Sequence, residues 1–96
     1  MFNPFTEHTE LLALRILRDA GRGIYGLDLV KASDGALKRG TVYITLGRLE
    51  DKGYVQSRLQ ADVKHPDIPR PMYRITALGE RALAEAELAG WNLAEA

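Results

Sequence analysis

The stretch Gly40-Thr-Val-Tyr-Ile-Thr-Leu-Gly-Arg-Leu-Glu-Asp-Lys-Gly53 has a defined beginning, a defined end and two chemically different faces. At roughly 100° per residue, one side carries an apolar stripe made of Val42, Leu46, Leu49 and Gly53. The opposite side carries Thr41, Ile44, Arg48, Asp51 and Lys52, with Tyr43 and Thr45 at the flanks. Such a helix suits the major groove of DNA. The same pattern is typical of any amphipathic surface helix, so the stretch alone leaves both interpretations open.

The size of the chain limits it to one compact domain. Its 96 residues are 46% hydrophobic, and a core of this size benefits from a permanent partner subunit. No apolar run approaches the roughly 18 residues that span a bilayer. The start Met1-Phe-Asn-Pro-Phe5 lacks the features of a signal peptide, so we expect a cytoplasmic protein with no membrane partner. The absence of cysteine excludes disulfides and thiolate metal sites.

The charge is unevenly distributed although the formal net charge is zero. Residues 38–74 carry eight basic and four acidic side chains, and the two ends of the chain carry the compensating negative charge. A basic middle with acidic ends gives the domain one surface that suits a polyanion such as DNA. The alternative is a set of solvated faces without a ligand, since charge asymmetry of this size also arises without function.

Two helices are expected before the opening stretch. The apolar run 11–17 predicts a central helix that begins near Asn3-Pro4 or at Thr6 or Thr9 and stops at 19–21. The segment 24–33 predicts a short second helix, which the turn signal Asp34-Gly35 ends. Leu37 is then expected to anchor the connection to the third helix over 40–53.

Beyond Gly53 the periodicity changes from helical to alternating. Residues 55–59 and 72–76 predict two strands, and the polar segment 61–70 between them predicts a long loop. We expect a two-stranded antiparallel ribbon whose loop carries Lys64, His65 and Arg70 at its tip.

The last segment predicts a helix that Thr76 caps and that continues to residue 94. It has two apolar stripes, one fit for the core and a second, with Ala77, Ala84, Leu88 and Trp91, that needs a symmetric partner to cover it. The expected fold is therefore mainly α with a small two-stranded β wing. It is a winged helix-turn-helix over 5–76 followed by a dimerisation helix over 77–94, within one domain over 1–96.

Three blocks of the sequence resemble the PadR-type transcriptional regulators, in the order that the family has. They are Tyr25-Gly-Leu-Asp-Leu29, the segment 37–55, and Pro71-Met-Tyr-Arg-Ile-Thr-Ala-Leu-Gly79, and together they cover most of residues 9–84. Two positions depart from the family pattern. Ile44 follows the tyrosine of the third helix, where proline is common, and Ala77 follows Thr76, where proline is frequent.

The resemblance implies a homodimeric repressor that binds a palindromic operator and is released by a small effector or by a change in dimer geometry. Some relatives bind planar aromatic compounds in a dimer-interface cavity lined by a C-terminal tryptophan. Trp91 matches that tryptophan, so Leu88 and Trp91 are the candidates for contact with an effector or a partner subunit. The alternative for Trp91 is a packing anchor at a helix end.

Candidate phosphate contacts lie at the start of the third helix. Lys38 and Arg39 precede it and are expected to add affinity with little sequence information. Thr41 is expected both to cap the helix and to hold a phosphate. For Tyr43 the resemblance implies a phosphate contact, although the ring also fits the flank of the core.

Base reading is expected chiefly from Thr45 and Arg48. Arg48 is long enough to take a guanine edge or a phosphate, and an ion pair along the helix without any ligand is about as plausible for this residue. Lys64, His65 and Arg70 would contact the flanking backbone or minor groove. The alternative for these three is a loop whose charges serve only solubility.

Enzymatic function finds no support in the sequence. His8 and His65 are the only histidines, and no catalytic set, metal-ligand cluster or glycine-rich phosphate loop surrounds either. We expect no catalytic residue, cofactor or metal. Two rivals to the DNA-binding repressor remain: a winged-helix module that binds another protein without specific DNA binding, and a regulator that mainly senses a small molecule through Trp91.

Overall fold

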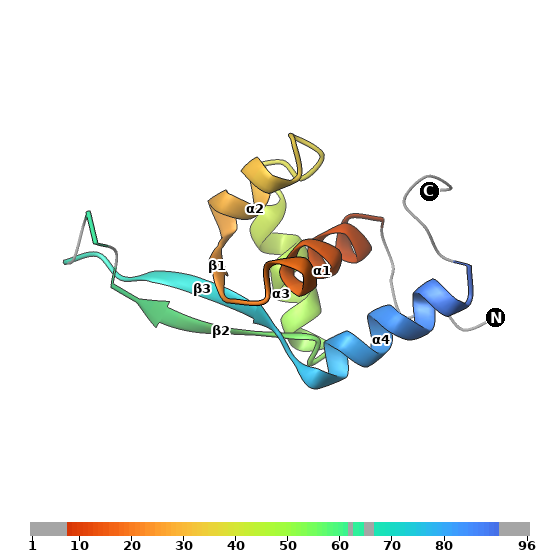
Figure 1. Cartoon of the computed structure of the whole chain (residues 1–96). Helices are drawn as coiled ribbons and strands as arrows, with labels where there is room; N and C mark the ends of the chain where they lie inside the picture. Colours follow the sequence, from red (N-terminus) through yellow and green to blue (C-terminus); the bar gives the residue numbers. More distant parts are fainter. Residues whose placement is uncertain (1–7, 62, 65–66, 91–96) are drawn as a thin grey trace.

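A computed structural model describes residues 8–61, 63–64 and 67–90. Within them the elements are α1 (His8–Ala20), β1 (Ile24–Tyr25), α2 (Gly26–Ala32), α3 (Val42–Asp51), β2 (Val55–Gln60), β3 (Arg70–Ile75) and α4 (Ala77–Leu88). The mainly helical fold with a small antiparallel sheet is confirmed. In Figure 1 the β2–β3 hairpin projects to one side, α4 runs to the other, and α1, α2 and α3 lie between them.

The sheet has three strands, whereas the sequence predicted two. Its order is β1-β3-β2, and every pairing is antiparallel. Ile24 and Tyr25, which we expected at the start of the second helix, instead pair with Tyr73 and Met72. Two residues are too few to show an alternating pattern, so no periodicity predicts a strand at this position. Gly23 precedes this strand because a Cβ there would lie 2.8 Å from Cγ of Met72.

The core is built around α1. Leu11, Leu14 and Leu17 are fully or almost fully buried, and α1 contacts α2, α3, α4 and β3. The predicted apolar stripe of α3 is confirmed, because Val42, Leu46 and Leu49 have no exposed surface. Its other face must therefore point away from the core.

The carboxyl end of α3 is fixed to α1 by an ion pair. Nζ of Lys52 lies 2.6 Å from Oε1 of Glu10, whose side chain is completely buried. The sequence placed Lys52 on the polar face of the helix beside Arg48, and that placement is wrong. Lys52 is the C-cap residue of α3, and Gly53 after it has a φ of +81°. The chain leaves the helix here, and the long side chain of Lys52 reaches back to α1.

Thr76 caps α4 as predicted. Its hydroxyl oxygen accepts a hydrogen bond from the Gly79 amide at 3.0 Å, and its hydroxyl donates to the Gly53 carbonyl at 2.7 Å. The end of the helix differs from the expected residue 94, because α4 stops at Leu88 and Gly90 follows with φ +92°. Residues 91–94, with Trp91 among them, lie outside the described residues.

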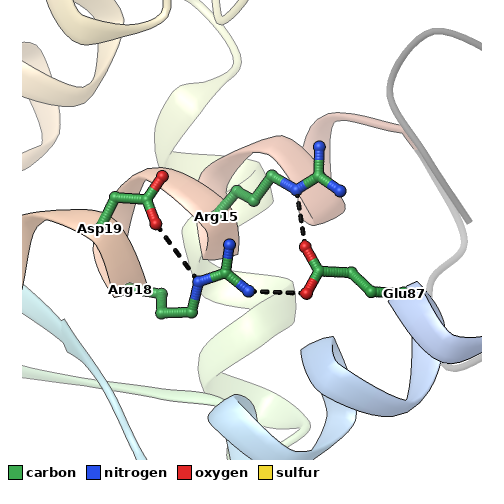
Figure 2. A network of polar contacts seen from close by, with 4 residues as sticks. All are labelled: Arg15, Arg18, Asp19 and Glu87. Carbon is green, nitrogen blue, oxygen red and sulfur yellow. Dashed lines mark hydrogen bonds and ion pairs between the residues drawn. The ribbon is translucent and has the colours of Figure 1, made fainter.

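Ion pairs from Glu87 hold α4 against α1, and Figure 2 shows their geometry. Each carboxylate oxygen of Glu87 binds a different arginine, with Nε of Arg15 at 3.0 Å and Nη1 of Arg18 at 2.7 Å. Arg18 also contacts Asp19 through Nε at 3.3 Å. The hydrogen bond from Arg18, aided by Arg15, lowers the pKa of Glu87 below its ordinary value of 4.5.

Because the pKa of Glu87 is lower in the folded chain, its ion pairs stabilise the fold fully above about pH 4.5 and lose this effect as the pH falls through the lower folded value. Replacing Glu87 by Gln should lower the free energy of unfolding at pH 7 by about 1 kcal/mol, since the three side chains are partly exposed. Urea unfolding of the variant and the wild type, compared at pH 7 and pH 3, measures this difference.

The matched control is Glu85→Gln, which removes an exposed carboxylate from the same helix. We expect the gap between Glu87→Gln and the wild type to close at pH 3, and the control to show almost no gap at either pH. Equal unfolding midpoints for the two variants at pH 7, or a gap unchanged at pH 3, would contradict this assignment.

Candidate nucleic-acid interface

The exposed face of α3 and the turn before it form one continuous surface. Lys38, Arg39 and Thr41 are exposed in the turn, and Arg48 is exposed on the helix. We call this surface, residues 38–48 on the side away from the core, the α3 outer face. In Figure 1, α3 begins beside α2, passes behind α1 and ends near β2.

The turn into α3 is closed by backbone groups. The Lys38 carbonyl accepts hydrogen bonds from the amides of Thr41 at 3.1 Å and Val42 at 2.8 Å. Thr41 stands at the N-cap position, but its side chain makes no capping hydrogen bond, so the predicted capping role is wrong. Its backbone at φ −125° and ψ −9° differs from the extended conformation that directs an N-cap side chain toward the helix amides. The hydroxyl group is thus left at the surface.

Thr45 does not lie on the α3 outer face. Its exposed fraction is 3%, and it is buried on the same side as Val42 and Leu49, which precede and follow it by three and four residues. The sequence placed it on a flank because a threonine is chemically compatible with either side of a helix. A side chain buried in this way cannot reach a base edge, so Thr45 is removed from the candidate contacts.

Tyr43 is half-exposed and held in one orientation by two neighbours. Its ring lies over Gly26, where an added Cβ would be 2.6 Å from Cε1 of the tyrosine. On another side it meets the Tyr73 ring, at 6.5 Å between centroids and 48° between planes. Burial, with help from Glu50 and Tyr43, raises the pKa of the Tyr73 hydroxyl. Tyr73 is therefore a structural residue that supports Tyr43 from the sheet.

The wing differs in part from the prediction. Lys64 is exposed in the connection between β2 and β3, whereas Arg70 opens β3 and pairs with Gln60. Arg70 therefore does not stand at the loop tip. Its guanidinium carbon lies 4.0 Å from the centre of the Tyr25 ring, a cation–π contact that ties the base of the wing to the start of α2. His65 lies outside the described residues.

The outer face of the sheet carries two further arginines, Arg58 and Arg74, and for Arg74 the sequence allows either a phosphate contact or an exposed strand residue. The register pairs Gln56 with Arg74 and Arg58 with Met72, so both arginines lie on the face opposite the buried Tyr73. Both border a shallow cavity of about 190 Å³. The alternation in the sequence, combined with the strand register, would have located them.

Acidic side chains are directed away from the first turns of α3. Glu50 accepts a hydrogen bond from the hydroxyl of Ser57 on β2 at 2.8 Å, which turns its carboxylate toward the sheet. Asp51 is exposed in the last turn. The positive charge of Lys38 and Arg39 therefore dominates the start of the helix, whereas Arg48 lies in its last turn with Glu50 and Asp51.

The second apolar stripe of α4 is exposed over its described part. Ala77 and Ala84 are exposed, and Leu88 keeps 88% of its surface accessible. On the same helix Leu78 is 44% exposed, whereas Leu83 is fully buried. The side of α4 that faces the core is thus formed by Ala82, Leu83 and Ala86.

Two classes of site are missing from the part of the chain that the structure describes. It holds no group of three or more His, Cys, Asp or Glu side chains placed to bind a metal ion. None of its helices has the length and apolar composition needed to cross a bilayer.

Comparisons with known proteins give one consistent family. The model of the transcriptional regulator PadR-like family matches residues 14–85 of this chain. A PadR family transcriptional regulator from Eggerthella lenta is 29% identical, and the match covers 86% of this chain and 74% of that chain with a TM-score of 0.69. The comparison with curated proteins gives no match.

Two further solved structures agree. A PadR-like transcriptional regulator from Bacillus cereus is 25% identical over 84% of this chain and 79% of that chain, with a TM-score of 0.65. A PadR family transcription regulator from Clostridium difficile, 24% identical, covers 86% of both chains with a TM-score of 0.72 and supports the fold.

The contact between Gly26 and Tyr43 gives a test of how the tyrosine is held. A Gly26→Ala substitution forces the Tyr43 ring away from α2, because the new methyl group would lie 2.6 Å from Cε1. The atoms that yield are the outer end of a half-exposed ring, and alanine favours the helix, so the free energy of unfolding should change by about 1 kcal/mol or less. The NMR resonances of the Tyr43 ring should shift clearly.

The control is Gly40→Ala, because a Cβ at Gly40 meets no atom within 4 Å. It should leave the Tyr43 ring resonances at their wild-type positions. Unshifted resonances in Gly26→Ala would show that Gly26 does not position the ring.

Proposed function

Since this chain belongs to the PadR-like family of transcriptional regulators, we propose that it is a homodimeric repressor that binds a palindromic DNA operator through α3 and is released by a small effector. The observation that carries this proposal is the α3 outer face, where exposed basic and polar side chains stand on a helix whose other side is fully buried. A helix held in this way is able to enter the major groove without disturbing the core.

Phosphate contacts supply affinity in this proposal. Lys38 and Arg39 approach the backbone at the start of α3, and the hydroxyl groups of Thr41 and Tyr43 donate to phosphate oxygens beside them. The support is their common location in the turn and first residues of the helix, all exposed. Arg48, one to two turns further along, reaches the groove floor and takes a base edge.

The wing extends the contact along the DNA. Lys64, in the exposed connection, lies against the flanking backbone, and Arg70 contributes positive charge from the base of the hairpin. Because Arg70 also stacks on Tyr25, it keeps the hairpin at a fixed angle to the helix-turn-helix. The wing and α3 thus act as one rigid surface.

Dimerisation is assigned to α4. Its exposed stripe of Ala77, Ala84 and Leu88 is apolar and needs a cover, and a second copy of the chain supplies one by two-fold symmetry. Two-fold symmetry then presents two α3 helices to two half-sites, which is why the operator is expected to be palindromic. Leu88 and Trp91 are proposed as the contacts for a partner subunit or a small aromatic effector. A regulator of this kind acts where the chromosome is, so we propose a cytoplasmic location.

A protein-binding module without specific DNA binding is the second candidate. The wing favours it through its apolar side chains, since Leu59, Val63 and Ile68 are 67%, 96% and 64% exposed. A labelled fragment of the protein's own promoter separates the two functions. The repressor should form a discrete complex that unrelated competitor DNA does not remove, whereas the protein-binding module should form none.

The role of Arg48 is tested with the Arg48→Ala variant. If Arg48 takes a base edge, the change should weaken specific binding by roughly 1–3 kcal/mol and leave binding to unrelated DNA almost unchanged. Fluorescence anisotropy with the promoter fragment and a scrambled fragment, at several salt concentrations, measures both affinities.

Arg22→Ala in the turn between α1 and β1 is the control, because it removes an exposed positive charge that lies outside α3, the wing and the exposed stripe of α4. It should bind like the wild type. Affinity should fall steeply with salt in every variant, since phosphate contacts release counterions. Binding that does not depend on salt would contradict the DNA-binding proposal, and equal losses for the two fragments would reduce Arg48 to a phosphate contact.

A further inference from the structure

Gly47 lies in the middle of α3, and no contact within the described chain requires a glycine at this position. Glycine in a helix interior costs about 1 kcal/mol relative to alanine. At Gly26 and Gly79 a Cβ would collide with a tyrosine ring or with the Tyr54 carbonyl, but a Cβ at Gly47 meets no atom within 4 Å. Its backbone is also not left-handed. The missing side chain therefore leaves open space at the helix surface, where an external molecule can approach the backbone closely.

Ile44 lies one turn before Gly47 and is exposed. It keeps 56% of its surface accessible, although β-branched aliphatic side chains usually lie inside a domain. Residues three and four apart share a helix face, so Ile44, Gly47 and Arg48 form one patch on the α3 outer face. Tyr43, the other exposed apolar side chain of α3, is held against Gly26 and Tyr73 instead.

This patch combines an apolar side chain, bare backbone and a guanidinium. In the major groove, the 5-methyl group of thymine is the apolar feature of the base edges, and the guanine edge is what arginine takes bidentately. We propose that Ile44 is a specificity-determining residue that packs on a thymine methyl group, and that Gly47 lets the α3 backbone approach closely enough for this contact. The inference rests on the proposed function and specifies the operator chemistry, a thymine beside the guanine that Arg48 contacts.

The experiment removes the methyl group from the DNA. The wild-type protein first selects its site from a random duplex pool, and footprinting defines the half-sites. Each thymine of one half-site is then replaced singly by deoxyuridine, which lacks the methyl group and keeps the hydrogen-bonding edge. At one or two positions the affinity of the wild type should fall about fourfold, the value for one buried methyl-sized group.

The Ile44→Ala variant provides the matched comparison. It should bind the thymine site several-fold more weakly than the wild type, and at the sensitive positions it should no longer distinguish deoxyuridine from thymine. Deoxyuridine placed outside the footprint is the DNA control and should change nothing. A penalty of equal size in both proteins would overturn the assignment of Ile44.

Gly47→Ala tests the close approach of the backbone. Because the new methyl group meets no atom of the chain, the urea midpoint should stay equal or rise, while affinity for the selected site should fall at least about tenfold. Unchanged affinity for the selected site would overturn the assignment of Gly47.

The outcomes separate this inference from the proposed function. If a footprint forms but no thymine position is sensitive in the wild type, Ile44 does not contact a thymine methyl group and the DNA-binding proposal stands. If no selected site or footprint is obtained, the DNA-binding proposal fails and the inference fails with it. If Ile44 instead contacts a protein partner, a footprint should form and no thymine position should be sensitive.

Discussion

The burial of α1 is the interaction on which the other parts of this structure depend. Leu11, Leu14 and Leu17 place their side chains in a core that α2, α3, α4 and β3 all help to enclose. Each buried leucine contributes roughly 1.5–3 kcal/mol relative to an exposed one, so this helix dominates a small core. Because the apolar stripe of α3 packs against α1, the opposite face of α3 points toward solvent.

Both ends of α3 are held by other elements as well. At its start the Tyr43 ring rests on Gly26 of α2, and at its end Lys52 forms an ion pair with the buried Glu10 of α1. Glu50 is hydrogen-bonded to Ser57 of the sheet. A recognition helix gains from such anchoring, because side chains presented to a groove must keep their geometry when the ligand arrives.

Sequence patterns predicted the structure correctly where a local rule applied along a helix or strand or at its end. The stripe of α3, the existence of strand β2 and the threonine cap of α4 follow from short-range rules, and the structure has all three, although β2 buries Val55 alone. The misses have a different origin. Strand β1 is two residues long and exists because β3 has an edge to pair, and Arg70 lies at the base of the wing because Tyr25 offers it a ring. Both depend on contacts between distant segments.

The two faces of α3 also show the limit of assigning single residues. Thr45 was expected to read DNA and is buried, while Ile44 departed from the family pattern and proves to be exposed. Rotating the helix by a fraction of a turn exchanges such residues, and the rotation is fixed by packing against α1, α2 and β2. Zero net charge is likewise uninformative, because the basic residues gather in the middle of the chain and the acidic ones near its ends.

The central claim is that the α3 outer face is the DNA contact surface. Its most direct test is an NMR titration of the isotope-labelled protein with the selected operator duplex, which follows the backbone amides residue by residue. The account predicts that the largest shift changes fall on residues 38–48, with smaller changes in the wing at Lys64. Changes concentrated on α4, with residues 38–48 unaffected, would contradict it.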